Sequence, residues 1–241
     1  MPALPLLRCL GQFQLELNEQ PTPLPTRKTA ALLVHLVLHP KPHGREQLAT
    51  LFWGDSGDEE ARRSLRNALT ALRKALGETA LLADRETVQF NPGYVLKVDA
   101  VDFRTQAQRF LAAPTPIPDA VDITLYRGDL LEGFYDDWIL REREALRQLY
   151  LQVLLRLAQH WRTQGDYLQT SAIAQRILTL DPAEEAAHQH LLFCYTMTGD
   201  RQAAQRQYEA CVHSLREELD VEPAPETVAL YRRSQQTRSR K

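Results

Sequence analysis

Apolar and polar residues alternate near the start of the chain. Residues 6–17 read LLRCL and then QFQLEL, with apolar side chains at every second position of the latter segment. This period predicts two or three short strands, which the turn formers and prolines of residues 18–25 end. Apolar residues then become dense over 31–38 and predict a buried helix, with Thr26 before it and prolines after it.

Residues 44–51 predict a second, short helix, followed by Phe52 and Trp53. These two aromatic residues lie between predicted helices that need a core, so we expect them to pack inside it rather than stack on a ligand. Glycine, serine and aspartate fill the next five positions, 54–58, and predict a turn with residues suited to cap a third helix.

The third helix is predicted over residues 61–76, ARRSLRNALTALRKAL, and it has two different faces. At about 100° per residue its leucines fall on one arc, while Arg, Lys, Asn and Thr fall on another. Acidic residues stand only before it, at Glu59 and Glu60, where a helix N-terminus favours negative charge. Such a helix has the groups that phosphates and base edges require, so the pattern predicts a recognition helix. A merely solvated face is the alternative interpretation.

Gly77 is suited to end this helix, and the residues after it predict a wing. LLADRETVQFNPGYVLKVD reads as strand, turn at Arg85 and Glu86, strand, turn at 91–93, and strand. Three helices, the third of them basic, followed by a hairpin are the winged form of the helix-turn-helix. We therefore predict a DNA-binding domain over residues 1–98.

From residue 99 onwards the pattern is almost entirely helical. A helix is expected over 103–111, then a proline-rich break at 113–118. Gly165 and Asp166 recur 34 residues later as Gly199 and Asp200, as Leu157 recurs at Leu191 and Trp161 at Tyr195. This is the period of tetratricopeptide repeats, whose helical hairpins stack and usually present a surface to protein partners. The expected fold is mainly α: a winged helix-turn-helix with small sheets, then all-α tetratricopeptide-like repeats over 99–241.

Composition and charge narrow the range of possible functions further. The chain has 241 residues, 44% of them hydrophobic and 25% charged, with a net charge of −2, so any DNA-binding surface is expected to be local. Arg8 interrupts the N-terminal apolar residues, which argues against a signal peptide or membrane span and for a cytoplasmic protein. Cys9, Cys194 and Cys211 are odd in number and are expected to be reduced and structural.

Nothing in the sequence predicts catalysis or a cofactor. His35 with His39, and His190 with Cys194, have a spacing that metals use, but neither pair has an obvious third ligand. The paired carboxylates of YDDW at 135–138 have no nucleophile or histidine nearby, and no phosphate-binding loop motif occurs. We expect a protein that is not an enzyme and that needs neither metal nor cofactor.

Two blocks of this sequence together resemble the SARP-type bacterial regulators, which join an OmpR-like winged helix to a bacterial transcriptional activator domain. The first block comprises LGQFQLEL, TRKTAALLVHLVLHP, GREQLATLFW and ARRSLRNALTALRKALG; the second comprises VDAVDF and YRGDLLEGFYDDWILREREALRQLYLQVLLRLA. Within the second block the residues that match the family pattern are Tyr126, Gly128, Asp129, Leu130, Leu131, Asp137, Trp138, Arg143 and Leu146.

The resemblance implies a DNA-binding transcriptional regulator, usually an activator that recruits RNA polymerase, with double-stranded promoter DNA as its ligand. It also implies paired or repeated half-sites, and hence a homodimer on DNA, but no cofactor. The sequence identifies no small-molecule ligand. The wing departs from the short, glycine-tipped form of the OmpR group. A repeat-based protein scaffold that does not bind DNA is the competing hypothesis.

The predicted DNA contacts fall into two groups. The centre of the polar arc is expected to read bases, because Arg can fork to guanine and Asn to adenine; it comprises Arg63, Asn67, Thr70 and Lys74. Phosphate contacts are expected at the edge of the arc, at the starts of the first two helices and at the wing turn, from Arg62, Arg66, Arg73, Thr26, Lys28, Arg45 and Arg85. Arg66 or Arg73 could instead pair with an acid inside the domain.

Overall fold

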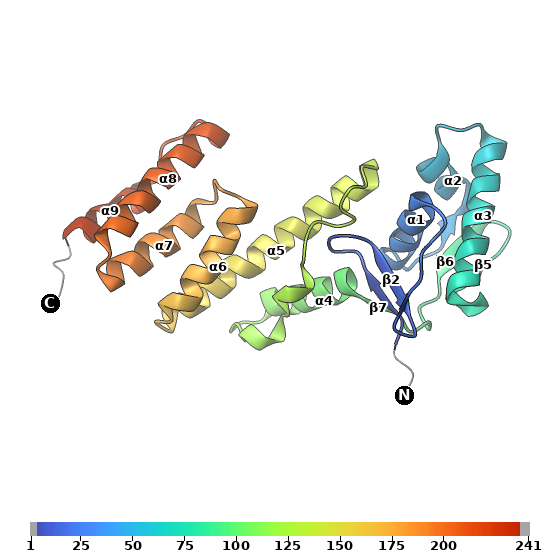
Figure 1. The fold of residues 1–241 in the computed structure, drawn as a ribbon, viewed down its shortest axis with the longest axis horizontal. Helices are drawn as coiled ribbons and strands as arrows, with labels where there is room; N and C mark the ends of the chain where they lie inside the picture. Colours follow the sequence, from blue (N-terminus) through green and yellow to red (C-terminus); the bar gives the residue numbers. More distant parts are fainter. Residues whose placement is uncertain (1–3, 237–241) are drawn as a thin grey trace. The chain divides into compact units, whose positions relative to one another are not determined.

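The computed structural model describes residues 4–236, which form two compact units (Figure 1). The first unit comprises the chain up to Thr105 together with Asp122–Leu146, and the second comprises Gln106–Val121 together with the chain from Arg147 onwards. Helices α4 (Asp99–Ala112) and α5 (Asp137–Thr163) each contribute to both units. The division after residue 98 stays a prediction about separately folding domains.

A four-stranded sheet opens the first unit. Its strands are β1 (Leu6–Arg8), β2 (Gln14–Leu17), β3 (Gln20–Pro21) and β7 (Lys97–Val98), in the order β3-β2-β1-β7. Leu7 lies opposite Leu15 in the antiparallel pair and opposite Val98 in the parallel pair, and all three side chains are buried. The early strands are confirmed. The last strand of the predicted wing is wrongly placed, because β7 lies in this sheet, where Val98 gains a buried position beside Leu7.

Three helices follow, as the sequence predicts: α1 (Arg27–Leu38), α2 (Arg45–Trp53) and α3 (Asp58–Leu76). The Thr26 side chain caps α1 by accepting a hydrogen bond from the Thr29 amide, at 3.1 Å. Gly77 ends α3 with φ of 94°, a conformation that favours glycine. Phe52 is buried at the end of α2, as expected, whereas Trp53 is only partly buried, with its ring centroid 5.7 Å from that of Phe52.

A second, three-stranded sheet carries the wing. Its strands are β4 (His43–Gly44), β5 (Leu81–Ala83) and β6 (Thr87–Phe90), antiparallel in the order β4-β6-β5. Asp84 closes the β5–β6 turn, since its Oδ1 accepts hydrogen bonds from the amides of Glu86 and Thr87 at 2.8 and 2.7 Å. Strand β4 has only two residues and no hydrophobic pattern, so it could not be predicted from the sequence.

A buried carboxylate joins the parts of the first unit. Asp99, at the start of α4, is 3% exposed, and its Oδ1 accepts hydrogen bonds from the amides of Cys9 and Ala100 at 2.9 and 2.8 Å. Its Oδ2 accepts from the Leu10 amide at 3.1 Å and from Arg127 at 3.2 Å. Burial, followed by the nearby carboxylate, raises the pKa of the Cys9 thiol well above its usual value.

The segment before α5 is folded onto β1 by backbone hydrogen bonds. Gly11 donates to the Asp129 carbonyl and the Leu131 amide donates to the Cys9 carbonyl, at 2.9 and 2.8 Å. Arg143 then donates to the carbonyls of Leu130, Leu131 and Phe134 at 3.0 to 3.1 Å. These bonds explain why residues 122–146 belong to the first unit.

An aromatic cluster lies between α1 and the start of α5. The His35 ring centroid is 4.8 to 5.0 Å from those of His39, His43 and Trp138. Within the described residues, His35 Nδ1 has no hydrogen-bond partner. Burial, together with the positive charge of the neighbouring His39, His43 and Lys41, lowers the pKa of His35 to about 3.

The second unit contains α6 (Tyr167–Leu180), α7 (Glu185–Thr198), α8 (Arg201–Leu219) and α9 (Pro225–Gln236). The predicted repeat is confirmed at its turns. Gly165 and Gly199 have φ of 74° and 75°, and the aspartates that follow them cap α6 and α8 through the amides three residues on, at 3.0 and 2.9 Å. Leu157 and Leu191, at matching positions, are both buried.

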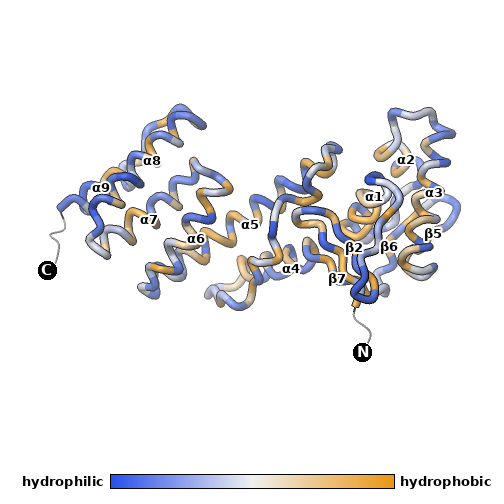
Figure 2. Tube along the Cα trace, viewed as in Figure 1, coloured by the Kyte–Doolittle hydropathy of each residue, from blue (hydrophilic) through white to orange (hydrophobic). Residues whose placement is uncertain are grey.

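Among residues 4–236, no helix combines the length and the apolar composition that a membrane crossing requires. Figure 2 shows hydrophobic stretches along the helices interrupted by hydrophilic ones every few residues, as expected of helices that bury one face only.

Replacing Asp99 by Asn should lower the free energy of unfolding by about 2–3 kcal/mol, because the side chain loses a charge that Arg127 and three backbone amides satisfy. Urea denaturation followed by circular dichroism measures the change. Asp102→Asn, in the same helix, is the matched control and should change stability by less than about 0.5 kcal/mol. Equal effects of the two variants would contradict the role assigned to Asp99.

His35 should make the protein less stable in mild acid. An unfolded histidine binds a proton below about pH 6.5, whereas folded His35 stays neutral down to about pH 3. Stability is therefore lost as pH falls through this window, by about 1 kcal/mol at pH 5.5. Urea midpoints between pH 7.5 and 5 should fall less steeply for His35→Phe than for the wild type, and parallel curves would show that His35 does not contribute.

Candidate DNA-binding surface

Helix α3 presents its polar arc to solvent and its apolar arc to the core. The buried residues of the helix are Ala61, Leu65, Ala68, Leu69, Leu72 and Leu76. The basic residues lie opposite and are exposed, apart from Arg73, which is partly buried. Acidic residues occupy only the first turn, Asp58–Glu60, where they favour helix formation through the helix dipole.

The four residues predicted to read bases are all exposed on this arc. Arg63 forms an ion pair with Glu60 one turn before it, and the Thr70 hydroxyl donates to the Arg66 carbonyl at 2.9 Å. The side chains of Asn67 and Lys74 make no hydrogen bond or ion pair with any residue between 4 and 236. The side chains that remain available for a ligand without rearrangement are therefore an amide and an ammonium group.

The arginines at the edge of the arc are partly occupied by carboxylates. Arg62 Nε lies 2.9 and 3.0 Å from the two carboxylate oxygens of Glu46 in α2, a contact that raises the pKa of Arg62. Arg73 Nε lies 3.6 Å from Glu78. The sequence left open a pairing of Arg73 with an acid, whereas the pairs of Arg62 and Arg63 were not expected. Water screens such exposed pairs, so they contribute little and can exchange for phosphate.

Arg45 and Arg85 are brought together by the wing turn. The Arg45 backbone amide donates to the Glu86 carbonyl at 2.8 Å, and its Nε donates to the Asp84 carbonyl at 2.9 Å. Arg85 lies in the same turn and is exposed. The start of α2 and the tip of the hairpin therefore meet at one edge, where Arg45 and Arg85 lie beside the exposed carboxylates of Asp84 and Glu86, although the two segments are about 40 residues apart in the sequence.

The start of α1 has a different arrangement from the one expected. The Thr26 hydroxyl is engaged as the helix cap and shares a hydrogen bond with the Thr29 hydroxyl at 2.8 Å, so it is not free for a phosphate. Lys28 is partly buried and forms no ion pair within the described part of the chain. The neighbouring Arg27, which the sequence analysis did not single out, is exposed and donates to the Gly133 carbonyl.

The other candidate chemistry is structural. Cys9, Cys194 and Cys211 are buried free thiols. Burial lowers the pKa of His190 to about 4, and no group of three or more His, Cys, Asp or Glu residues within 4–236 is placed to hold a metal ion. In the YDDW segment Trp138 is buried against His35 and Phe52, consistent with a structural corner.

Comparison with known proteins places this arrangement in a family. Residues 98–234 match the family described as the bacterial transcriptional activator domain. The transcriptional regulatory protein MoaR1 of Mycobacterium tuberculosis is 26% identical over 238 residues, which cover 92% of this chain and 76% of MoaR1. MoaR1 of Mycobacterium bovis is similar to the same extent.

A solved structure has the same fold at low sequence identity. Mycobacterium tuberculosis EmbR, in complex with a low-affinity phosphopeptide, superimposes with a TM-score of 0.74 and 21% identity over 96% of this chain. The present chain spans 65% of the length of that EmbR chain. Since the activator-domain match covers more than half of the sequence, the chain belongs to the bacterial transcriptional activator domain family, the family of the SARP-type regulators.

Proposed function

We propose that this chain binds promoter DNA through α3 and the β5–β6 wing and thereby activates transcription. The observation that carries the proposal is the exposed arc of α3, which beyond its first turn carries basic, amide and hydroxyl groups and no acidic residue. The arc lies on a helix-turn-helix, and the hairpin turn that carries Arg85 is bound to α2 through Arg45. A major groove accepts a helix of this kind, and phosphates flank it on both sides.

The proposed DNA contacts differ in whether the side chain already has a partner within the protein. Asn67 and Lys74 make the first base contacts because they have no partner to give up, and Arg63 and Thr70 join them after local rearrangement. The phosphate contacts come from Arg45, Arg62, Arg66, Arg73 and Arg85, from Lys28 and from the backbone at Thr26. The arginines that are paired with carboxylates exchange those partners for phosphate oxygens.

The second unit is proposed to contact protein rather than nucleic acid. Helices α6 to α9 form stacked antiparallel pairs, which usually bind proteins through an exposed face. The proposed partners are RNA polymerase and, on repeated half-sites, a second copy of this chain. The proposal requires no catalytic step and no cofactor, and it places the protein in the cytoplasm with the DNA.

A scaffold without DNA binding is the competing function. It explains the helical repeats but gives no reason for a helix with cations along its exposed arc in a winged helix-turn-helix. The two functions differ in their dependence on salt, because a DNA-binding protein releases about 0.9 counterions for each phosphate that it neutralises. No measurable binding to genomic DNA fragments at 50 mM salt, or weak binding that does not change up to about 200 mM salt, would favour the scaffold.

Replacing Arg63, Asn67 and Lys74 together by Ala should weaken binding to the operator at least about 100-fold, because each good base contact contributes about 1–3 kcal/mol. The operator is the fragment that the wild-type protein retains from its own genomic DNA, and fluorescence anisotropy measures binding. The melting temperature should stay within about 2 °C of the wild type, since all three side chains are exposed.

The control for this variant is Gln202→Ala, Arg206→Ala and Arg232→Ala. It removes the same number of positive charges and one amide, from exposed positions of α8 and α9 in the second unit. Its operator affinity should stay within about 2-fold of the wild type. An equal loss in both variants would mean that overall charge, rather than the α3 arc, determines binding.

Glu46→Gln should strengthen binding to DNA of any sequence. The substitution frees the Arg62 guanidinium and removes one negative charge next to the proposed interface. We expect affinity for an unrelated duplex at 50 mM salt to increase about 2- to 5-fold, with a salt dependence steeper by up to about one counterion. Glu226→Gln, an exposed carboxylate in α9, is the matched control and should leave affinity unchanged. Weaker binding by Glu46→Gln would show that Glu46 positions Arg62 productively.

A further inference from the structure

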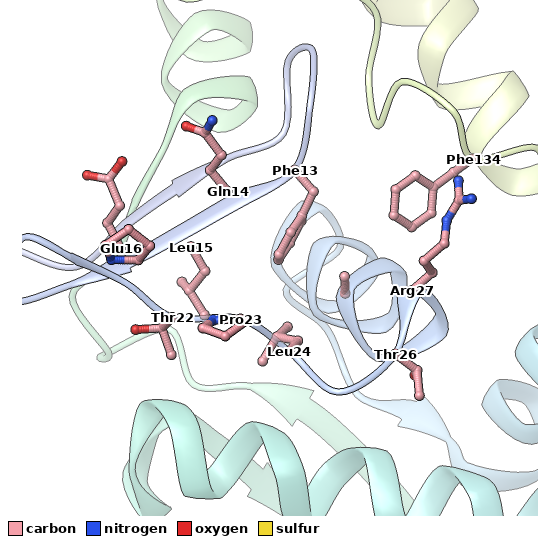
Figure 3. Close-up of a pocket in the computed structure, with 12 residues that line it drawn as sticks. Phe13, Gln14, Leu15, Glu16, Thr22, Pro23, Leu24, Thr26, Arg27 and Phe134 are labelled. Atoms are coloured by element: carbon pink, nitrogen blue, oxygen red, sulfur yellow. The ribbon is translucent and has the colours of Figure 1, made fainter.

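A hollow of about 570 Å³ lies in the first unit, away from the α3 arc (Figure 3). Its walls come from β2, from the connection between β3 and α1, from the first turn of α1 and from Phe134. All of these residues belong to one compact unit, so their relative positions are defined. The volume is in the range of small-molecule sites.

The inner walls are apolar because successive side chains of β2 point to opposite faces of the sheet, and the apolar ones face the hollow. Figure 3 shows Phe13, Leu15 and Leu24 directed toward the hollow, while Gln14 and Glu16 point away from it. Those two polar side chains are engaged by Arg8 on the other face, at 3.2 and 2.9 Å. No carboxylate is therefore directed into the hollow from β2.

The rim, in contrast, carries a cation. Arg27 begins helix α1, whose first turn has no acidic residue, and its side chain lines the hollow. The Arg27 carbon Cζ lies 4.4 Å from the centroid of the Phe134 ring, and its guanidinium donates to the Gly133 carbonyl. These two contacts fix the orientation of the guanidinium but use only one of its five N–H donors. The remaining donors match the geometry of a carboxylate.

We propose that this hollow is a binding site for a small apolar carboxylate. The apolar body of the ligand packs against Phe13, Leu15 and Leu24, and its carboxylate accepts hydrogen bonds from Arg27. Gly133 and Phe134 belong to the activator-domain match, whereas β2 and α1 precede it. An occupied site thus joins the winged part to the start of the activator domain. The inference is independent of DNA binding.

The test compares a charged ligand with an uncharged ligand of the same shape. The full chain is titrated by calorimetry with 1-naphthylacetate and with 2-(1-naphthyl)ethanol. The carboxylate should bind with a dissociation constant of about 0.1 mM, a typical affinity for a ligand of about 14 non-hydrogen atoms. The alcohol should bind about 10-fold more weakly, because it lacks the charge that Arg27 recognises.

Three variants locate the binding. Arg27→Gln should weaken carboxylate binding about 10-fold and alcohol binding less than 2-fold, whereas Lys41→Gln, an exposed cation beyond the other end of α1 and outside the hollow, should change neither. Leu24→Trp, which adds volume inside the hollow at a partly exposed position, should abolish both, and circular dichroism checks that it folds.

The proposal is overturned if the wild type binds neither compound, if the alcohol binds as tightly as the carboxylate, or if folded Leu24→Trp binds both like the wild type. None of these measurements contains DNA, so their failure is distinguishable from a failure of the proposed promoter binding.

Discussion

The first unit depends on the buried carboxylate of Asp99. Its two oxygens accept hydrogen bonds from the amides at the end of β1, from the first turn of α4 and from Arg127. A charge with 3% exposure is tolerated only because these donors replace water. The same contacts decide that residues 122–146 fold with the winged part, since Arg127 and the Asp129–Leu131 segment meet β1 at this point.

The proposed DNA-binding surface follows from this framework. Strand β7 pairs with β1 immediately before Asp99, so the chain leaves the wing at a fixed place after Phe90. Arg45 ties the hairpin turn to α2, and Glu46 in the same helix holds Arg62 of α3. The elements that would meet a groove and its two phosphate backbones are thereby connected by short polar contacts. The carboxylates that make these contacts also moderate the positive charge of the surface.

In the helical repeats, the period of the sequence corresponds to a repeated backbone conformation. The glycines at 165 and 199 adopt the same left-handed conformation, and each following aspartate caps the next helix with nearly identical backbone angles, φ −83° with ψ 84° or 83°. Glycine is favoured there because the conformation is strained for other residues, and aspartate because its oxygen satisfies a free amide. The repeat could be predicted from sequence because both requirements are local.

The sequence by itself determined the local elements: the early strands, the three helices of the winged part with their caps, the two faces of α3 and the repeats. Each of these depends on hydrophobic periodicity or on a neighbouring residue, which the sequence displays directly. Tertiary structure decided what depends on distant partners. Strand β7 pairs with β1 rather than with the wing, and the two-residue strand β4 forms only by pairing with β6. Likewise, Arg62 pairs with Glu46 of another helix, and Phe134 lines the hollow at the start of α1. These contacts join residues 16 to more than 100 positions apart, and their register is set by packing that no local pattern records.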